Sequence, residues 1–337
     1  MAALRVGVLS FAHPHALGYV HALAAQPELE VVSTDVGMPD SGTLRGPELA
    51  AELGVTYLPD VAAVLATRPD AVIVTSDNAG HRDLVEQALA AGADVLCEKP
   101  LATADADADA MVRAAEDAGQ LLMTAYPVRF SPAFGQLLAR VRAGQLGRIL
   151  SVQATNNGKM PLAERSWFTD PERSGGGALV DHVVHVADLL DELLGEPAQD
   201  VHALTNRIMH AETGVQVETG AMVTITYPGG VIAQLDSSWH LPDSAPTWGG
   251  LTLEVHGTAG AMRIDPFSQH LAGYDTSGAL WDAYGPDLDA AMIGEFLDAV
   301  RTRRTPQPDG ATGARTLAVV TAAQRSAATG EVELVKP

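Results

Sequence analysis

Lys99 lies in the segment Glu98-Lys99-Pro100, directly after an apolar run at 93–96 that predicts a short buried strand. Open parallel α/β sheets bind their ligands in the crevice at the carboxyl ends of the strands. Pro100 fixes its own φ and favours an extended backbone at Lys99, so the position of the lysine is reproducible. Lys99 is therefore a candidate catalytic group; the alternative is a solvated lysine at a strand end.

A second candidate group follows the glycine run Gly175-Gly176-Gly177. Asp181 and His185 are four residues apart in a stretch with helical spacing, so they share one face and their side chains can meet. An aspartate beside a histidine can hold the ring and raise its basicity, which suits general acid–base chemistry. The alternative is a helix with an incidental histidine, like the neighbouring His182. The apolar face predicted to pack comprises Leu179, Val183, Val186, Leu190 and Leu193.

Together these motifs resemble those of the Gfo/Idh/MocA family, the glucose-fructose oxidoreductase and inositol dehydrogenase group. The segment Thr75-Ser76-Asp77-Asn78 with His81 resembles the family's Thr-Pro-Asn loop and its following histidine. The segment 126–132, which contains Arg129, resembles its Arg-Phe-x-Pro segment. The likeness extends to 193–197 and to the closing stretch 295–326, so it covers the chain almost from end to end.

The alternation of apolar runs with helical stretches predicts an α/β fold, with a doubly wound parallel sheet of the Rossmann type at the N-terminal end. The strand candidates there are 6–9, 29–33, 71–75, 95–97 and 121–124. Thr103 is the predicted cap of the helix that follows Pro100. We expect a dinucleotide-binding domain at 1–125 and a substrate-binding and oligomerisation domain at 126–337.

The second domain is predicted to be α+β. A helix at 132–143 and the helix after the glycine run precede a strand-rich region, and a helix at 315–328 closes the chain. Short turns such as Pro228-Gly229-Gly230 predict a large, mostly antiparallel open sheet. The strand candidates are 201–208, 221–227, 231–237, 252–256 and 261–264.

The first turn departs from the family pattern, which has Gly-x-Gly-x-x-Gly after the first strand. Ser10 and Ala12 stand where the first two glycines are expected, and Pro14 can begin the helix. The register beyond Ala12 has two solutions. Either Gly18 and His21 match the last glycine and a following histidine after an insertion, or His15 is that histidine and the loop is shortened.

Asp35 follows the second strand candidate and fits the acid that holds a ribose 2′-hydroxyl, although a turn residue is the alternative. The first cation after it is Arg45, which favours NAD over NADP. His13 and His15 suggest a metal site, but no Cys, Asp or Glu sits beside them in the sequence, so we predict no metal and expect His13 to border the pyrophosphate. The resemblance implies the following cofactor-binding residues: Ser10, Phe11, Ala12, His13, Asp35, Ser76, Asp77, Asn78, His81, Glu98, Lys99 and Arg129.

The resemblance implies hydride transfer between nicotinamide and a secondary hydroxyl of a sugar, inositol or related polyol. His185 would be the general base, Lys99 would donate a hydrogen bond to the reacting oxygen, and Asp181 would orient His185 or grip a neighbouring hydroxyl. Trp167 and His182 are further candidates for substrate contact. Two alternatives remain: a non-catalytic dinucleotide-binding regulator on the same fold, and an enzyme that uses NAD transiently for epimerisation, elimination or glycoside cleavage.

Composition excludes several classes of protein. The chain has 337 residues, 47% of them hydrophobic, and a net charge of −21, which argues against a nucleic-acid or acidic-membrane surface. It has no apolar run of the roughly 18 residues that cross a membrane, and no signal-peptide pattern. The single cysteine fits a reducing compartment, so we expect a cytoplasmic protein. By resemblance we expect a homodimer or homotetramer formed through the C-terminal sheet.

Overall fold

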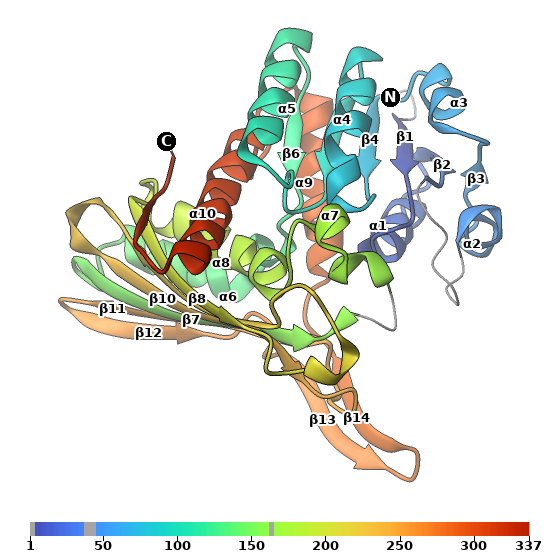
Figure 1. Cartoon of the computed structure of the whole chain (residues 1–337). Coiled ribbons are helices and arrows are strands. Elements are labelled where there is room, and N and C mark those ends of the chain that lie inside the picture. The colour runs from blue at the N-terminus through green and yellow to red at the C-terminus, as the bar shows by residue number, and fades with distance from the viewer. Residues whose placement is uncertain (1–3, 37–44, 162–164, 337) are drawn as a thin grey trace. The chain divides into compact units, whose positions relative to one another are not determined.

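The computed structural model describes residues 4–36, 45–161 and 165–336. Within them the chain divides into two compact units, and neither is one continuous segment (Figure 1). The expected division after residue 125 lies one residue from the first change of unit, between Tyr126 and Pro127. Two later segments, Pro161–Gly175 and Asp289–Leu317, nevertheless join the first unit.

The first unit contains the predicted parallel sheet. Its described strands have the order β3-β2-β1-β4-β5-β6, and every neighbouring pair is parallel. The strands are β1 (Leu4–Leu9), β2 (Leu29–Thr34), β3 (Thr56–Tyr57), β4 (Ala71–Val74), β5 (Asp94–Cys97) and β6 (Leu122–Thr124). This order confirms the Rossmann type, since it reverses direction between β1 and β4.

The helices of the first unit are α1 (His15–Ala24), α2 (Gly46–Glu52), α3 (Val61–Ala66), α4 (His81–Ala90), α5 (Asp105–Ala118), α7 (Pro171–Ser174) and α9 (Leu288–Thr302). Helices α1 to α5 connect these strands, and α7 and α9 come from the two later segments of the first unit. The buried faces of β4, β5, α4 and α5 form one apolar core. The prediction that Thr103 caps α5 is wrong: the helix begins after Ala104, which offers no side-chain oxygen.

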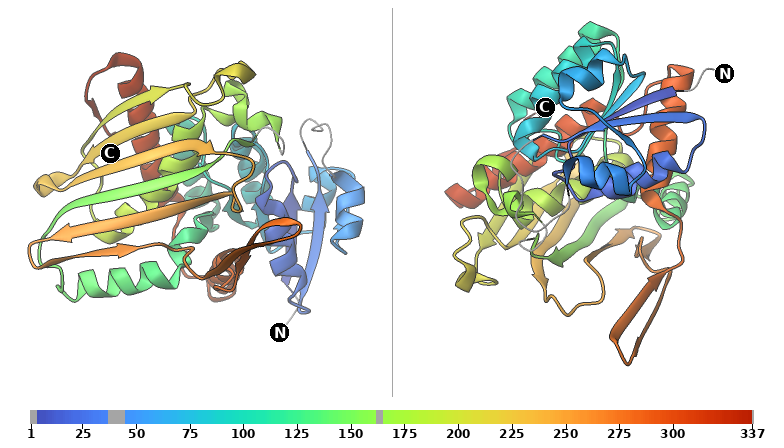
Figure 2. Two further views of the ribbon diagram at one scale, coloured as in Figure 1. Left: turned by 90° about the horizontal axis from the view of Figure 1, so that it is seen from below. Right: turned by 90° about the vertical axis from the view of Figure 1, so that its right-hand side faces the viewer.

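The second unit is built on a large, mostly antiparallel sheet, as predicted (Figure 2, left). In the described part of the chain its strands have the order β12-β11-β7-β10-β9-β8-β15, and β7 and β10 are the parallel neighbours. The strands are β7 (Ile149–Lys159), β8 (Asp200–Asn206), β9 (Gly220–Thr226), β10 (Ile232–Leu241), β11 (Gly249–Gly257), β12 (Gly260–Ile264) and β15 (Glu333–Leu334).

Helices cover one face of this sheet. Helix α8 (Ala178–Leu194) packs against β7, β9 and β10, and α6 (Pro132–Arg142) packs against β12. Helix α10 (Gly310–Thr329) begins in the first unit, ends in the second and precedes β15. Side chains alternate along β10: Ala233, Leu235 and Trp239 are buried, whereas Ile232 at the start of the strand and Gln234 are exposed.

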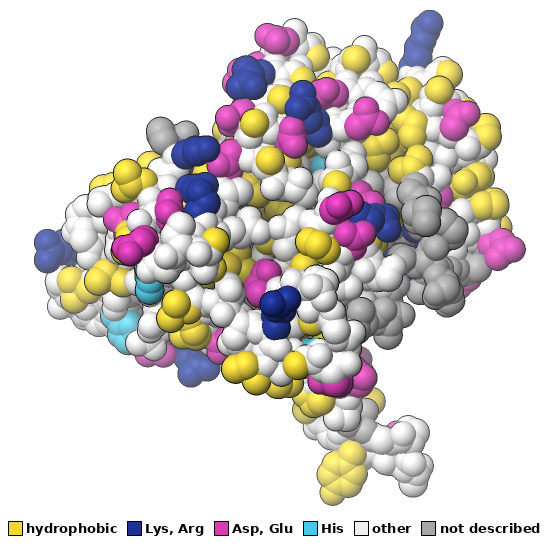
Figure 3. All heavy atoms as spheres, viewed as in Figure 1, with side chains coloured by type: hydrophobic (Ala, Val, Ile, Leu, Met, Phe, Trp, Pro, Cys, Tyr) yellow, Lys and Arg dark blue, Asp and Glu magenta, His cyan; other side chains and the backbone are white. Residues whose placement is uncertain are grey.

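A separate hairpin, β13 (His270–Asp275) with β14 (Gly278–Ala283), extends beyond the large sheet in the second unit. Two large side chains of this hairpin are unusually exposed to solvent: Leu271 is 60% and Tyr274 is 89% exposed. Figure 3 shows apolar side chains at its projecting end. The helices among the described residues include none that is long and apolar enough to cross a membrane.

Candidate functional site

The turn after β1 keeps a glycine-like backbone without glycine. Ser10 has φ 86°, a left-handed conformation that is uncommon for any residue with a side chain. Its hydroxyl accepts the backbone N–H of Ala12 (3.1 Å) and donates to the carbonyl of Val36 (3.0 Å). Since these hydrogen bonds offset the strain, the tight turn survives the replacement of glycine by serine.

Two buried side chains from the segment 165–169 fasten this turn. Arg165 Nε and Trp167 Nε1 each donate to the carbonyl oxygen of Ala12, both at 3.0 Å. Trp167 is 1% exposed and stacks on Phe168 with ring centroids 4.0 Å apart. The indole therefore packs against the candidate cofactor turn, and a contact between Trp167 and substrate stays a prediction.

Helix α1 begins at His15, so the turn leads directly into a helix N-terminus. Gly18 and His21 lie within this helix. The helix start meets the carboxyl edge of the sheet, where the positive end of the helix dipole favours an anion such as a phosphate. The N–H groups of His15, Ala16 and Leu17 already donate to His13 and Pro14. The tight turn, the small buried Ala12 and this helix start fit the pyrophosphate of a dinucleotide.

Asp35 lies at the end of β2, where its carboxylate organises the turn. It accepts the backbone N–H groups of Phe11 (2.8 Å) and Gly46 (3.0 Å). The guanidinium of Arg45 also binds it, with Nη2 2.6 Å from Oδ1, and both side chains are about nine-tenths buried. The sequence-based argument that no cation lies close to Asp35 is therefore wrong, because folding brings Arg45 into contact with the carboxylate. Residues 37–44, between Asp35 and Arg45, lie outside the described residues.

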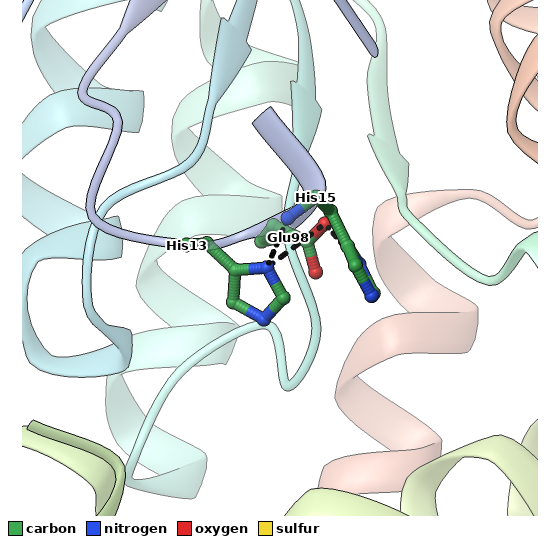
Figure 4. A group of neighbouring side chains, drawn as sticks. All are labelled: His13, His15 and Glu98. Carbon is green, nitrogen blue, oxygen red and sulfur yellow. Dashed lines mark hydrogen bonds and ion pairs between the residues drawn. The ribbon is translucent and has the colours of Figure 1, made fainter. Parts of the chain in front are cut away.

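Glu98 is completely buried and contacts three side chains from the turn and α1, two of which, His13 and His15, are drawn in Figure 4. One of its oxygens, Oε1, lies 3.0 Å from His15 Nδ1, 3.9 Å from His13 Nδ1 and 2.5 Å from the hydroxyl of Tyr19, which donates to it. The other oxygen accepts the backbone N–H of Lys99 (3.0 Å). Burial opposes ionisation of Glu98, but the two histidines and Lys99 outweigh it and hold the pKa of the carboxyl well below its usual range.

The ligand atoms of His13, His15 and Glu98 lie within 4.8 Å of one another, a spacing that could hold a metal ion. The premise that no acid accompanies the histidines is therefore wrong, because β5 brings Glu98 to them from 83 residues away. Two of these ligand atoms already accept hydrogen bonds, however. His13 Nδ1 accepts the backbone N–H of His15 (3.2 Å), and Glu98 Oε1 accepts from Tyr19.

The loop after β4 connects the turn to the Glu-Lys-Pro segment. Thr75 accepts the backbone N–H of His13 (2.9 Å), and the buried ring of His81 lies 3.0 Å from the carbonyl of Pro100. Asp77 pairs with Arg173 (2.6 Å), and Asn78 donates to the carbonyl of Ser174 (2.8 Å). Ser76 is buried beside them. Cofactor contacts of these residues stay predictions.

Lys99 is 4% exposed and follows the end of β5, as expected. Cys97, two residues earlier, is also buried, and burial raises the pKa of its thiol well above the usual value. A neutral buried thiol is a poor nucleophile, so Lys99 is the candidate reactive group of this segment.

In the second unit, helix α8 starts where the glycine run ends. A Cβ on Gly177 would lie 2.0 Å from the backbone oxygen of Glu218, and one on Gly176 would lie 2.5 Å from Val180. The carboxylate of Glu218 accepts the N–H groups of Gly177 (2.8 Å) and Leu179 (3.1 Å). The glycines thus allow the loop before β9 to approach closely and cap the helix.

The predicted faces of α8 are confirmed. Asp181 and His185 are partly exposed on one face, and the apolar side chains named above are all buried. The carboxylate of Asp181 accepts Trp239 Nε1 (3.1 Å) and lies 3.2 Å from His182 Nε2. That Asp181 orients His185 stays a prediction.

Arg129 lies in an ion-pair network of the second unit. Its guanidinium binds Asp188 (2.5 Å) and Glu192 (2.7 Å) from one face of α8. Burial raises the pKa of Asp188 to about 6 even though Arg129 opposes the shift. These contacts fix α8 to the segment before α6, and a contact of Arg129 with a cofactor stays a prediction.

Comparison with protein families agrees with this architecture. Residues 6–126 match a model described as an oxidoreductase family with an NAD-binding Rossmann fold, and residues 134–263 match the Gfo/Idh/MocA C-terminal domain. The chain belongs to the Gfo/Idh/MocA family.

Individual members of the Gfo/Idh/MocA family resemble the chain over most of its length. It is 30% identical to 1,5-anhydro-D-fructose reductase of Ensifer adhaerens, across 97% of this chain and 96% of that protein. It is 27% identical to 2,7-anhydro-N-acetylneuraminate hydratase of Escherichia coli, across 78% and 72%. The crystal structure of GenD2 from gentamicin A biosynthesis, in complex with NAD, superposes with a TM-score of 0.87 at 25% identity, covering 100% of this chain and 97% of that one.

Four residues with defined contacts near the candidate groups were missed by sequence reasoning: Tyr19, Arg165, Glu218 and Trp239. Tyr19 lies within the helix that Pro14 is predicted to begin, and its hydroxyl has no motif to mark it. Trp239 lies beyond the predicted end of its strand at 237. Residue type gave a weak signal for Trp239 and Tyr19, because the polar atom of a tryptophan or tyrosine needs a hydrogen-bond partner when the side chain is buried.

Proposed function

We propose that this member of the family is an NAD(P)-dependent oxidoreductase that moves a hydride between nicotinamide and a secondary hydroxyl of a sugar, inositol or related polyol. The observation that carries the proposal is the buried Lys99 at the carboxyl end of β5, behind a turn that fits a pyrophosphate. The name of the Ensifer reductase supports the substrate class. The bound nicotinamide would supply the hydride acceptor or donor.

Side chains of the protein would accept the proton of the substrate hydroxyl and stabilise the charge on its oxygen. His185, partly exposed on α8, takes the proton of the substrate hydroxyl during oxidation. Lys99 donates a hydrogen bond to the same oxygen and stabilises its negative charge. Asp181, held by Trp239, orients His185 or grips a neighbouring hydroxyl. His182 and Trp167 are proposed substrate contacts of lower priority, since both rings are buried.

The direct test is a panel of sugars, polyols and 1,5-anhydro-D-fructose, each with NAD(H) and NADP(H), followed by nicotinamide absorbance and by product analysis. A net absorbance change with a substrate supports the dehydrogenase. Conversion of a substrate without a net absorbance change identifies transient use of the cofactor. Binding of dinucleotide without conversion of any substrate supports a regulator, and absence of dinucleotide binding contradicts the proposal altogether.

We propose NAD as the preferred cofactor. Asp35 would repel a 2′-phosphate, although Arg45 reduces that repulsion by pairing with it. Asp35→Asn removes the charge and keeps one acceptor oxygen, although its NH2 group cannot replace the oxygen that accepts from Gly46 and Arg45 Nε. In a variant that thermal unfolding shows to be folded, the preference for NAD, measured as the ratio of the dissociation constants for NAD and NADP, should fall. A wild-type protein that binds NADP more tightly would contradict the assignment of Asp35.

We also propose a cytoplasmic homodimer or homotetramer that forms through the large sheet. Among the described residues no helix covers the second face of this sheet (Figure 2, left), which carries polar side chains with few charges and scattered apolar ones. Its central residues Thr155, Met222 and Asp236 lie side by side on neighbouring strands. A face of this composition is typical of a surface that a second copy can cover.

A further inference from the structure

The two histidines of the cofactor turn differ in their surroundings. The side chain of His13 is 3% exposed, and its Nδ1 accepts a backbone N–H. The side chain of His15 is 36% exposed and stands at the first position of α1. Its Nδ1 faces Glu98 at 3.0 Å, so the other ring nitrogen, Nε2, is on the far side of the ring from the carboxylate.

Charged groups on every element around His15 act on its protonation. Glu98 follows β5 and contacts the ring, Asp289 on α9 adds a second negative charge, and Lys99 opposes both. Burial favours the neutral ring, but Glu98 and Asp289 outweigh burial and Lys99 and raise the pKa of His15. Tyr19 stays a neutral donor to Glu98, because burial raises the pKa of its hydroxyl well above the usual value.

These contacts favour a proton over a metal ion in the cluster. A metal would have to displace the N–H that His13 accepts and the hydrogen bonds that Glu98 Oε1 accepts. It would also add positive charge close to Lys99, whose field already acts on Glu98. The same contacts suit an imidazolium, which donates from Nδ1 to Glu98 and keeps Nε2–H for a ligand.

We propose that His15, protonated and held by Glu98, donates a charged hydrogen bond to a phosphate of the dinucleotide. This side-chain contact takes the place of the backbone N–H groups with which a glycine-rich turn binds the phosphate. The inference rests on the proposed cofactor. It assigns to this chain a titratable phosphate contact at the helix start that receives the pyrophosphate. Binding then takes up a proton whenever the ring is neutral beforehand.

The sign of the pH effect follows from the histidine. The interaction is complete while His15 is protonated and is lost as the pH rises through its raised folded-state pKa. Calorimetric titration of the full chain with NAD should therefore give a dissociation constant about 10-fold larger at pH 8.5 than at pH 6.5, the effect of one charged hydrogen bond. Buffers with different ionisation enthalpies should reveal proton uptake on binding.

Probes and variants separate the alternatives. ADP-ribose should show the same pH dependence as NAD, and adenosine, which has no phosphate, should show none. At every pH, His15→Gln should bind NAD as weakly as the wild type does at pH 8.5. His21→Gln, on the exposed side of the same helix, should bind NAD as the wild type does at each pH. Thermal unfolding checks that each variant is folded, and His15→Asn serves if His15→Gln is not.

Three results would overturn the inference: NAD binding that is equal at both pH values, a His15→Gln variant that keeps the pH dependence, or about one equivalent of bound transition metal that disappears in that variant. A dependence that appears with adenosine would assign His15 to the nucleoside and not to phosphate. Failure of the wild type to bind any dinucleotide contradicts the proposed function itself, so the two failures are distinguishable.

Discussion

Single residues decide the chemistry, and Lys99 and His185 carry the proposed proton transfer. We expect Lys99→Met and His185→Asn each to lower turnover by about 10²–10⁴-fold, the typical contribution of a positioned acid–base group. Dinucleotide affinity measured by calorimetry should change little. Lys336→Met and His21→Asn are matched controls at exposed positions. Near-normal turnover in either test variant would remove that residue from the mechanism.

His182 is unsuited as a control for His185, although it is adjacent in sequence. Its Nε2 lies 3.2 Å from Asp181, and its ring is buried against β7, where Gly158 leaves room for it. Replacing it would disturb the carboxylate that is proposed to act in catalysis. Helical spacing alone does not predict the contact between His182 and Asp181, because adjacent residues of a helix point in different directions.

We expect Trp239 to act as a positioning residue, because its Nε1 donates to the carboxylate of Asp181. Trp239→Phe keeps most of the buried ring but removes the N–H that Asp181 accepts. We expect kcat to fall about 10-fold, as for loss of a hydrogen bond to a charged group, with a smaller change in KM. Trp248→Phe, at a 43% exposed tryptophan, is the matched control. A variant with unchanged kcat but lower thermal stability would show that Trp239 only packs.

Elements position these residues, and the start of α8 depends on close approach of a loop. Gly177→Ala places a methyl group 2.0 Å from the backbone oxygen of Glu218, which cannot move as a flexible side chain could. We expect a loss of about 3 kcal/mol in the free energy of unfolding, as for a severe overpacking change. Urea denaturation measures it.

The control is another glycine replaced in the same way. Gly294 is exposed on α9, and a Cβ there would meet nothing within 4 Å. Gly294→Ala should stabilise the protein by about 0.5–1 kcal/mol, because alanine is the better helix former. Equal effects of the two substitutions would contradict the close approach at Gly177.

The sequence allowed most of the first unit to be predicted, since buried parallel strands are continuous apolar runs. Strand β7 was missed because its inward positions include Asn156 and Gly158 beside Val152 and Ala154, which breaks the apolar alternation. The hairpin β13–β14 was missed because its side chains are mostly exposed. Strand β3, with two residues, has no pattern to detect.

The candidate site was predictable in its motifs but not in its contacts. Glu98, Lys99, Asp181 and His185 belong to recognisable segments. The pairing of Glu98 with His15 and of Arg45 with Asp35 depends on which strand ends meet, and local spacing does not encode that. Arguments from the sequence alone therefore did not anticipate that Glu98 joins the two histidines or that Arg45 pairs with Asp35.

At the scale of the whole molecule, the uncovered face of the large sheet leads to a prediction about assembly. Light scattering during size-exclusion chromatography should show a dimer or tetramer. Thr155→Arg, at the centre of that face, should shift the protein toward monomer, because an unpaired buried charge is costly in an interface. Gln87→Arg on α4 should leave the assembly unchanged. A monomeric wild type would contradict the proposal.

The discontinuous first unit has a consequence for how the protein is made. The backbone N–H of Thr124, in β6, donates to the carbonyl of Pro308, and Met123 forms a bridge with Asp309. A ribosome delivers these partners of β6 only after nearly the whole second unit has been synthesised. Until then the edge of the sheet at β6 lacks these partners in the nascent chain. We therefore expect the two units to finish folding together, and not in the N-to-C order that separate domains follow.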